Sequence, residues 1–444
     1  MTRRLTLALI VATLLAVAAG PPSAVRPPEG GPATAPPPPA VRPLPGGRLG
    51  LLDRSMTSLE GRVGPPGENP RARTAQALQD LASLRLTGDP SYYARADALL
   101  RQAHAAAPAD PDTLVGLGVL ALSRHDFGQA LTWGEQAVAA APYRAPAHGV
   151  LVDAYVELGR YDQAVAALQR MLDLRPDQSS YARASYLREL HGDLPGAIEA
   201  MQMAVEAAPP GGEPTEWARV HLGHLHFASG SLDAAESVYR EALAYLPGYP
   251  HATAGLARVA VARGDYPSAI RLYLEATRSV PFPEYVIQLA DVYRAAGRAA
   301  EAEEQEGLVR VMERLYASNG VDTDLEMALF DADRGVELES AVERLRAQWG
   351  RRRSVQVADA LAWALYRQGD CREADAFVVE ALHLGTRDGL TRFHAGKIAL
   401  CLGDADRARA RLAEALSPNR HFSLRYAPEA EELLRSLGDG APGR

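Results

Sequence analysis

An alanine recurs along this 444-residue chain at nearly constant intervals, and this spacing limits the possible folds more than any other feature. Successive members of the series lie 34, 34, 33, 38, 34, 33, 39, 33 and 34 residues apart. A unit of this length is one supersecondary element, which buries its apolar side only by stacking on its neighbours. The spacing therefore predicts an array of stacked units. The recurring alanines are Ala96, Ala130, Ala164, Ala197, Ala235, Ala269, Ala302, Ala341, Ala374 and Ala408.

The residues around each alanine predict a pair of helices. In the copy that spans residues 145–178, Gly159 separates two helical stretches and Pro176 closes the unit. Glycine adopts the left-handed conformation that ends many helices, and a helix does not run unbroken into proline. The unit resembles the tetratricopeptide repeat, a helix–turn–helix of 34 residues, over roughly residues 71–420. This resemblance implies an all-α superhelix, a TPR solenoid of about ten helix–turn–helix repeats.

The two long intervals in the series suggest how the array is divided. The first contains Pro209-Pro210-Gly211-Gly212, which lengthens a loop. The second contains residues 301–318, which lack a helix breaker and predict one lengthened helix before a turn at Asn319-Gly320. We expect sub-arrays at residues 71–318 and 321–420, with flexing between them. A helix over residues 427–437 is expected to cap the stack.

The N-terminal segment is predicted to direct export rather than to form part of the fold. Residues 1–19 combine Arg3 and Arg4 with an apolar run, a pattern typical of a cleaved secretory signal peptide. An uncleaved anchor is the alternative. Residues 20–70 are rich in proline and glycine and predict a disordered linker. The sequence therefore predicts an extracytoplasmic protein, secreted or in the cell envelope, that meets the membrane only through its export signal.

Charge and motif content favour protein partners over nucleic acid and catalysis. The net charge is −8, so the chain lacks the basic surplus that neutralises phosphates. Removing Arg3 and Arg4 with the signal peptide brings it near −10. Nucleophile-elbow, phosphate-loop and zinc-protease motifs are missing from the sequence. We therefore expect neither enzyme activity nor a cofactor.

The resemblance also implies where a partner would bind. In tetratricopeptide arrays the first helix of each repeat lines a concave groove, and certain repeat positions point into it. Aromatic residues and arginine, which dominate binding hot spots, are concentrated at those positions. The predicted groove residues are Tyr186, Trp217, His224, Phe227, Arg258, Asp291, Arg294, Phe330, Trp363, Tyr366, Arg367 and Phe393.

Three smaller features resemble functional signals but favour structural roles. The groove positions that hold basic residues in carboxylate-clamp arrays are occupied here by residues such as Glu326 and Asp359, which argues against a clamp. The cluster His221, His224 and His226 does not converge on one helix face, so we expect no metal site. The run at residues 351–353 consists of three arginines and is expected to be a solvated turn between repeats.

The two cysteines, Cys371 and Cys401, lie toward the same edge of the predicted stack. An exported protein meets an oxidising environment, so a disulfide between them is possible. Two buried free thiols are the equal alternative.

The leading functional hypothesis is an exported scaffold that binds a protein or peptide in the aromatic-rich groove without catalysis. The alternative is a structural or assembly factor of the cell envelope that acts by self-association.

Overall fold

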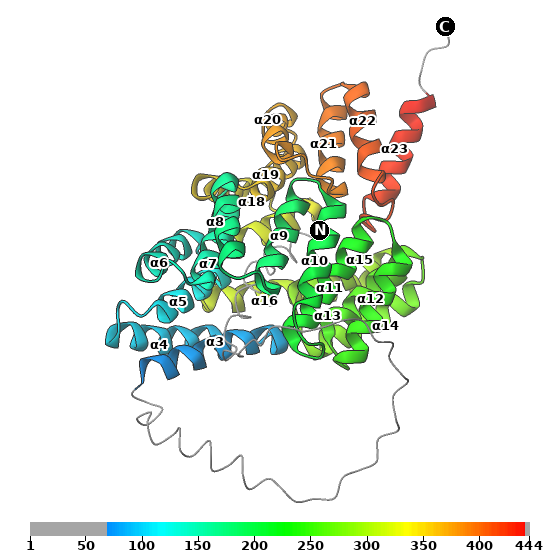
Figure 1. Cartoon of the computed structure of the whole chain (residues 1–444). Coiled ribbons are helices and arrows are strands. Elements are labelled where there is room, and N and C mark those ends of the chain that lie inside the picture. The colour runs from blue at the N-terminus through cyan, green and yellow to red at the C-terminus, as the bar shows by residue number, and fades with distance from the viewer. Residues whose placement is uncertain (1–68, 440–444) are drawn as a thin grey trace, which may run out of the picture.

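The computed structural model describes residues 69–439, and within this range every regular element is a helix, without a strand. Figure 1 shows the helices as a succession of hairpins, which confirms the predicted all-α repeat architecture. The predicted signal peptide and nearly all of the predicted linker lie outside the described residues. The first described helix begins at Pro70, one residue before the predicted start of the array.

Ten hairpins and one final helix make up the described chain. The first five hairpins pair α3 (Pro70–Thr87) with α4 (Ser91–Ala106), α5 (Pro111–Ser123) with α6 (Phe127–Ala140), α7 (Ala145–Glu157) with α8 (Tyr161–Leu174), α9 (Gln178–Leu190) with α10 (Leu194–Glu206), and α11 (Glu213–Ala228) with α12 (Leu232–Tyr245). The next five pair α13 (Pro250–Ala262) with α14 (Tyr266–Ser279), α15 (Pro283–Ala295) with α16 (Ala299–Ser318), α17 (Asp324–Arg334) with α18 (Leu338–Arg351), α19 (Val355–Gln368) with α20 (Cys371–Leu382), and α21 (Gly389–Cys401) with α22 (Ala405–Leu416). Helix α23 (Ala427–Asp439) follows them.

The recurring alanines explain the close packing of each hairpin. All ten of them are 0% exposed, because each faces the partner helix of its own repeat. Glycine allows a similar approach on the first helices. A Cβ atom on Gly396 would lie only 2.9 Å from Leu412 Cγ, and one on Gly118 would lie 2.6 Å from Val150 Cγ1. These positions therefore require small residues because a larger side chain would force the helices apart.

Two helices predicted from local sequence are present in the structure. Helix α16 has 20 residues and is the lengthened helix that the missing breaker indicated. Gly320, at the turn after it, has a left-handed backbone with φ 77°. Helix α23 includes the predicted range 427–437, and its role as a cap stays a prediction. The division into two sub-arrays with flexing between them stays a prediction. Val309 and Trp363, on either side of the expected boundary, belong to one apolar cluster.

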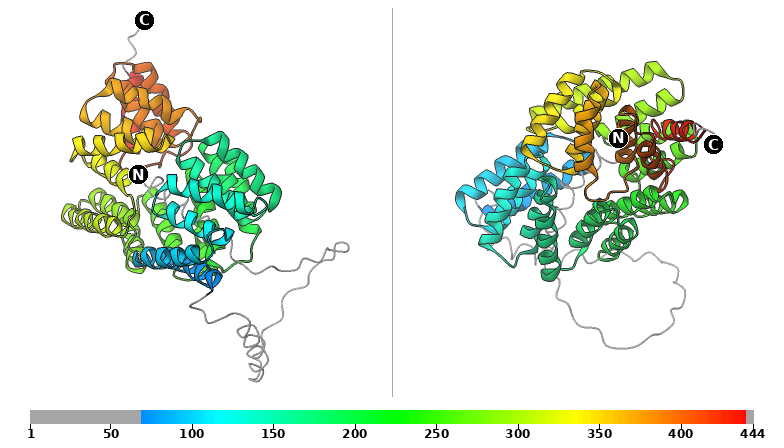
Figure 2. Two further views of the ribbon diagram at one scale, coloured as in Figure 1. Left: turned by 90° about the vertical axis from the view of Figure 1, so that its left-hand side faces the viewer. Right: turned by 90° about the horizontal axis from the view of Figure 1, so that it is seen from above.

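The hairpins wind into a superhelix whose second turn lies directly on its first. Seen from above, the yellow segment returns over the blue and cyan one (Figure 2). The contacts follow a fixed register: the turn inside each of the first five hairpins meets the loop that follows the hairpin five repeats later. The five contacts are Gly88 with Val280, Arg124 with Asp322, Gly159 with Arg353, Gly192 with Gly385, and Gly230 with Pro418. We call this line of contacts the interturn seam.

Apart from the Val280 side chain, the seam is made of backbone and buried polar side chains. The amide of Asp322 donates a hydrogen bond to the carbonyl of Arg124 (3.0 Å). Gly159 has φ +75°, and a Cβ atom there would overlap the carbonyl oxygen of Arg353. In contrast, a Cβ on Gly264 or Gly403, in hairpin turns outside the seam, would meet no atom of residues 69–439 within 4 Å. In the hairpin turns of the seam, glycine therefore allows the close contact between the two superhelical turns as well as the turn of its own hairpin.

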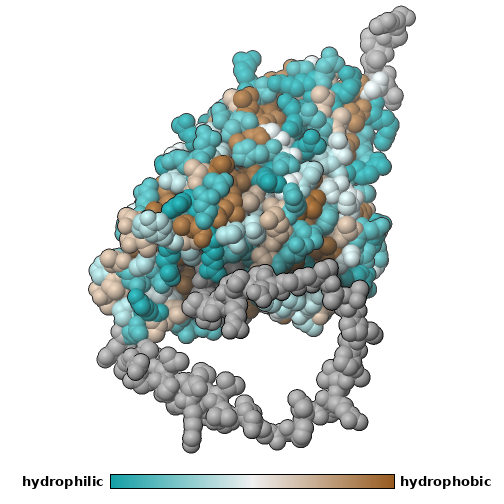
Figure 3. All heavy atoms as spheres, viewed as in Figure 1, coloured by the Kyte–Doolittle hydropathy of each residue, from teal (hydrophilic) through white to brown (hydrophobic). Residues whose placement is uncertain are grey.

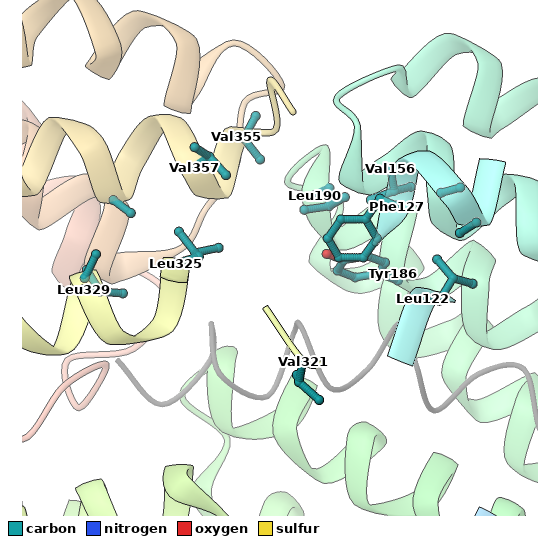
Figure 4. Packing of buried hydrophobic residues seen from close by; sticks show 14 of the residues in the cluster. Leu122, Phe127, Val156, Tyr186, Leu190, Val321, Leu325, Leu329, Val355 and Val357 are labelled. Atoms are coloured by element: carbon teal, nitrogen blue, oxygen red, sulfur yellow. The ribbon is translucent and has the colours of Figure 1, made fainter. Parts of the chain in front are cut away.

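Apolar side chains from both turns form one core behind the seam. Figure 4 shows Phe127 and Tyr186 of the first turn on one side and Leu325 and Val355 of the second turn on the other. All four are buried members of a single cluster. The inner space of this superhelix is therefore largely filled by its own chain.

Candidate protein-binding pocket

Half of the predicted groove residues are buried in the core. This corrects the expectation that these rings face an open groove, because neighbouring repeats, the second superhelical turn or the final segment of the chain cover them. Except for Phe227, which also lines the pocket described below, these rings cannot contact a partner in this conformation. The six, with their exposed fractions, are Tyr186 (5%), Trp217 (6%), Phe227 (1%), Phe330 (2%), Trp363 (2%) and Phe393 (0%).

Trp363 shows what covers these rings. Its Nε1 donates a hydrogen bond to Asp333 Oδ1 (2.8 Å), and its ring stacks on His394 with 4.1 Å between centroids. Phe393 in turn stacks on Tyr426 at 5.0 Å. Aromatic pairs at such separations add to the stability that burial itself provides. Trp363 and its neighbours therefore form a structural cluster.

Four other predicted groove residues are more accessible but engaged within the chain. His224 Nδ1 is hydrogen-bonded to Tyr239 Oη (2.6 Å), and Arg294 pairs with Glu306 (2.6 Å). The remaining two are Arg367 and Tyr366. Arg367 donates a hydrogen bond to the backbone carbonyl oxygen of Asp333 (3.1 Å), and the Tyr366 ring stacks on the Trp363 ring with 5.1 Å between centroids.

Phe227, Arg258 and Asp291 come together at a pocket of about 490 Å³. Helices α13 and α15 form one wall, and residues 417–426, which connect α22 to α23, form the other. We call this segment the connector and the cavity the connector pocket. It is the place where predicted groove residues still line an open space.

The connector is held in position by aromatic and polar contacts. Leu424 packs against the apolar cluster of α13–α15. Tyr426 Oη donates a hydrogen bond to Asp333 Oδ1 (2.7 Å), and Asn419 Nδ2 donates to the carbonyl oxygen of Phe227 (2.7 Å). The sequence reasoning missed this wall. Its only signal was the run from His421 to Tyr426, with aromatic residues outside any repeat.

The lining of the connector pocket combines positively and negatively charged side chains with an aromatic ring. The Arg258 guanidinium lies 3.9 Å from the centre of the Phe227 ring, a cation–π geometry. Asp291 accepts a hydrogen bond from Arg334 Nη2 (3.1 Å). Burial raises the pKa of Asp291, and the charge of Arg334 opposes that shift. The exposed Arg425 lies at the rim. Such a surface suits a segment with apolar and charged side chains.

Three other sequence features have defined places. Cys371, at the start of α20, and Cys401, at the end of α21, form a disulfide with 6.2 Å between their Cα atoms. His221 packs on Trp217 with ring centroids 3.8 Å apart. Arg352 was expected to be solvated, but it is 4% exposed and pairs with Glu157 across the interturn seam, which corrects that interpretation.

Among the helices in residues 69–439, none combines the length and the apolar character that crossing a bilayer requires.

Comparison with known proteins supports the repeat assignment. Sequence patterns of the tetratricopeptide repeat match residues 121–187, 226–286 and 283–305. A curated relative is the cellulose synthase 1 operon protein C of Komagataeibacter xylinus, 27% identical over 229 residues. That match covers 52% of this chain and 14% of the relative, so the chain spans only a small part of its length.

Two solved structures are among those similar to this chain. The type IV pilus biogenesis factor PilW is 19% identical with a TM-score of 0.38, and the match covers 45% of this chain and 92% of PilW. A thermophilic TPR protein of Thermus thermophilus is 22% identical with a TM-score of 0.36, covering 46% of this chain and 98% of that one.

The constant spacing, the ten helical hairpins and the matching repeat patterns agree, and the chain belongs to the tetratricopeptide repeat family.

Proposed function

We propose that this protein is an exported scaffold of the cell envelope that binds a segment of another protein in the connector pocket, without catalysing a reaction. The observation that carries the proposal is the meeting of Phe227, Arg258 and Asp291 at an open pocket of about 490 Å³. Tetratricopeptide repeats are typical of protein-interaction scaffolds. The mixed lining favours a peptide that presents an aromatic or aliphatic side chain next to a charged one.

Export is supported by the signal-peptide pattern of residues 1–19 and by the disulfide of Cys371 and Cys401, which suits an oxidising compartment. The likeness to a protein of a cellulose synthase operon makes envelope proteins the first partners to test.

The test is selection of peptides from a random display library on the full chain, followed by calorimetry with each selected peptide. We expect Arg258→Ala to weaken binding about tenfold or more, because it removes a cation from the base of the pocket. The matched control is Arg271→Ala, an exposed arginine on α14, which should bind like the wild type. Equal affinities for all three proteins, or failure to select any peptide, would contradict the proposal.

Self-association remains a second candidate because of an apolar stripe on α16. Leu308, Val311 and Leu315 share one helix face and are 41%, 50% and 47% exposed. The side of the molecule in Figure 3 mixes hydrophilic residues with smaller hydrophobic areas. Light scattering would support this candidate if a wild-type dimer became a monomer on Val311→Glu. A monomeric wild type would exclude it.

A further inference from the structure

A second cavity, separate from the connector pocket, lies between the two superhelical turns. It has a volume of about 90 Å³. Helices α3, α4 and α5 of the first turn line one side, and α15, α16 and α17 of the second turn line the other. We call it the interturn cavity. It exists only because the coil closes, so it is a property of this superhelix rather than of a single repeat.

The wall of the interturn cavity is mainly apolar. Leu84, Ile287, Val309 and Met327 contribute aliphatic side chains from both turns. A water molecule occupies about 30 Å³ in the liquid, so the space holds roughly three water-sized groups. It is therefore sized for the end of a side chain or a small molecule.

Glu326 brings a buried carboxylate to this apolar wall. Its residue is 8% exposed, and neither carboxylate oxygen is hydrogen-bonded within the described part of the chain. The nearest basic group is His125, whose Nδ1 lies 3.9 Å from Glu326 Oε1. That nitrogen already donates a hydrogen bond to the carbonyl oxygen of Asp322 (2.7 Å). A buried carboxylate without a hydrogen-bond donor is costly.

The other charged residues of the lining do not supply a counter-charge. Arg85 forms an ion pair with Glu213 (2.7 Å). Glu313, a second lining carboxylate, is near Arg310 (3.4 Å) and Arg344 (3.6 Å), which lie outside the lining. Glu284, a third lining carboxylate, accepts a hydrogen bond from Gln288 Nε2 (3.1 Å). The cavity thus offers one carboxylate, Glu326, in need of donors and a hydrophobic wall beside it.

We propose that the interturn cavity binds an alkylammonium or guanidinium group, which donates to Glu326 while its methylene stem lies against the aliphatic wall. Charge-assisted hydrogen bonds of this kind are strong. A bare divalent metal would need several oxygen ligands, and the site offers mainly aliphatic surface. The group belongs either to a free amine or to a lysine or arginine side chain of a bound protein.

The site goes beyond the proposed function because it does not depend on the connector pocket. Glu284 and Ile287 of α15 line both cavities, so the two lie on either side of one helix. Ligand binding in the interturn cavity can therefore be measured in a variant whose connector pocket is altered. Arg258→Ala should therefore leave binding in the interturn cavity unchanged.

The test is titration of the full chain with n-butylammonium, followed by calorimetry. We expect saturable binding that 1-butanol does not reproduce and that weakens at least tenfold in Glu326→Gln. The matched control is Glu275→Gln, an exposed glutamate on α14, which should bind like the wild type. Absence of binding to the wild type, or equal binding by Glu326→Gln, would overturn the proposal.

A second measurement covers the case in which Glu326→Gln does not fold. Binding to the native state raises the melting temperature by mass action. n-Butylammonium should do so for the wild type, whereas tetramethylammonium, which has no N–H donor, should not. Equal shifts with both ions would overturn the proposal.

A comparison of two peptides distinguishes a protein side chain from a free amine as the source of the group. A short glycine peptide with one central lysine is compared with the same peptide carrying norleucine. Binding of the lysine peptide supports a protein side chain as the ligand, and binding of n-butylammonium alone supports a free amine.

Discussion

Arg352 Nη1 lies 2.9 Å from Glu157 Oε2, and this ion pair joins residues 195 positions apart in the sequence. Both side chains are buried, at 4% and 5% exposure, and the Arg352 guanidinium also lies 4.7 Å from the centre of the Phe127 ring. Burial raises the pKa of Glu157, and the charge of Arg352 opposes that shift. The pair therefore holds the two superhelical turns together at a point where neither charge has water as an alternative partner.

Removing Arg352 should loosen the interturn seam. We expect Arg352→Ala to destabilise the fold by about 3–5 kcal/mol, because Glu157 would keep a buried charge without its partner. Urea unfolding followed by circular dichroism measures the loss. Arg351→Ala is the control, since Arg351 is 58% exposed and its surface pairs are worth little. Similar losses in the two variants would show that the seam pair has no special role.

Trp363→Ala should damage the fold rather than only weaken partner binding. The Trp363 ring is 2% exposed and packs among His394, Phe393 and Tyr426, so its removal leaves a cavity. Comparable truncations cost about 3–5 kcal/mol. Thermal unfolding should show a lower melting temperature for Trp363→Ala than for Tyr366→Ala, whose ring is only half-buried. A wild-type melting curve for Trp363→Ala would mean that this cluster is not structural.

Reduction of the disulfide should destabilise the last two hairpins. The bridge spans 30 positions between Cys371 and Cys401. In the chain-entropy account, a loop of this size contributes about 3–4 kcal/mol by restricting the unfolded chain. Reductant should lower the melting temperature of the wild type and leave the double variant Cys371→Ala, Cys401→Ser unchanged. If reductant has no effect on the wild type, the bridge does not form in the purified protein.

Acid should weaken the packing around His221. Burial lowers the pKa of His221 to about 3, and the nearby His251 adds to this shift. The unfolded chain therefore binds a proton that the folded chain does not, so stability falls as pH drops below about 6.5 toward 3. This group contributes roughly 1.4 kcal/mol per pH unit across that window.

The variant His221→Phe, which keeps a ring beside Trp217, should have a shallower decline in stability below pH 6.5. His191→Phe, at an exposed histidine, should retain the wild-type slope. Unfolding by urea at several pH values makes the comparison, and parallel curves for all three proteins would disprove the assignment to His221.

The sequence predicted what is repeated and local. Each recurring alanine is completely buried, and Gly159 and Gly192 have the left-handed conformation that hairpin turns need. These features depend on contacts within one repeat or between neighbours, so a periodic pattern reveals them. The lengthened helix α16 was predictable for the same reason, because the absence of a breaker is a local property.

The superhelical closure was not predictable by that reasoning. It depends on the small rotations of five successive repeats, and Arg352 carries no local sign that it will meet Glu157. The connector was missed because it occurs once and has no periodic counterpart. Burial of Trp363 and Phe393 follows from the connector, because Tyr426 packs against both rings.

The five-repeat register restricts how such a chain can change in length. An open array tolerates the gain or loss of a unit because only adjacent units touch. Here, deleting one hairpin between Gly88 and Val280 would displace every later partner along the seam by one step. Evolutionary growth or shortening of this protein is thus expected at its ends, while the number of hairpins within one circuit is fixed by geometry.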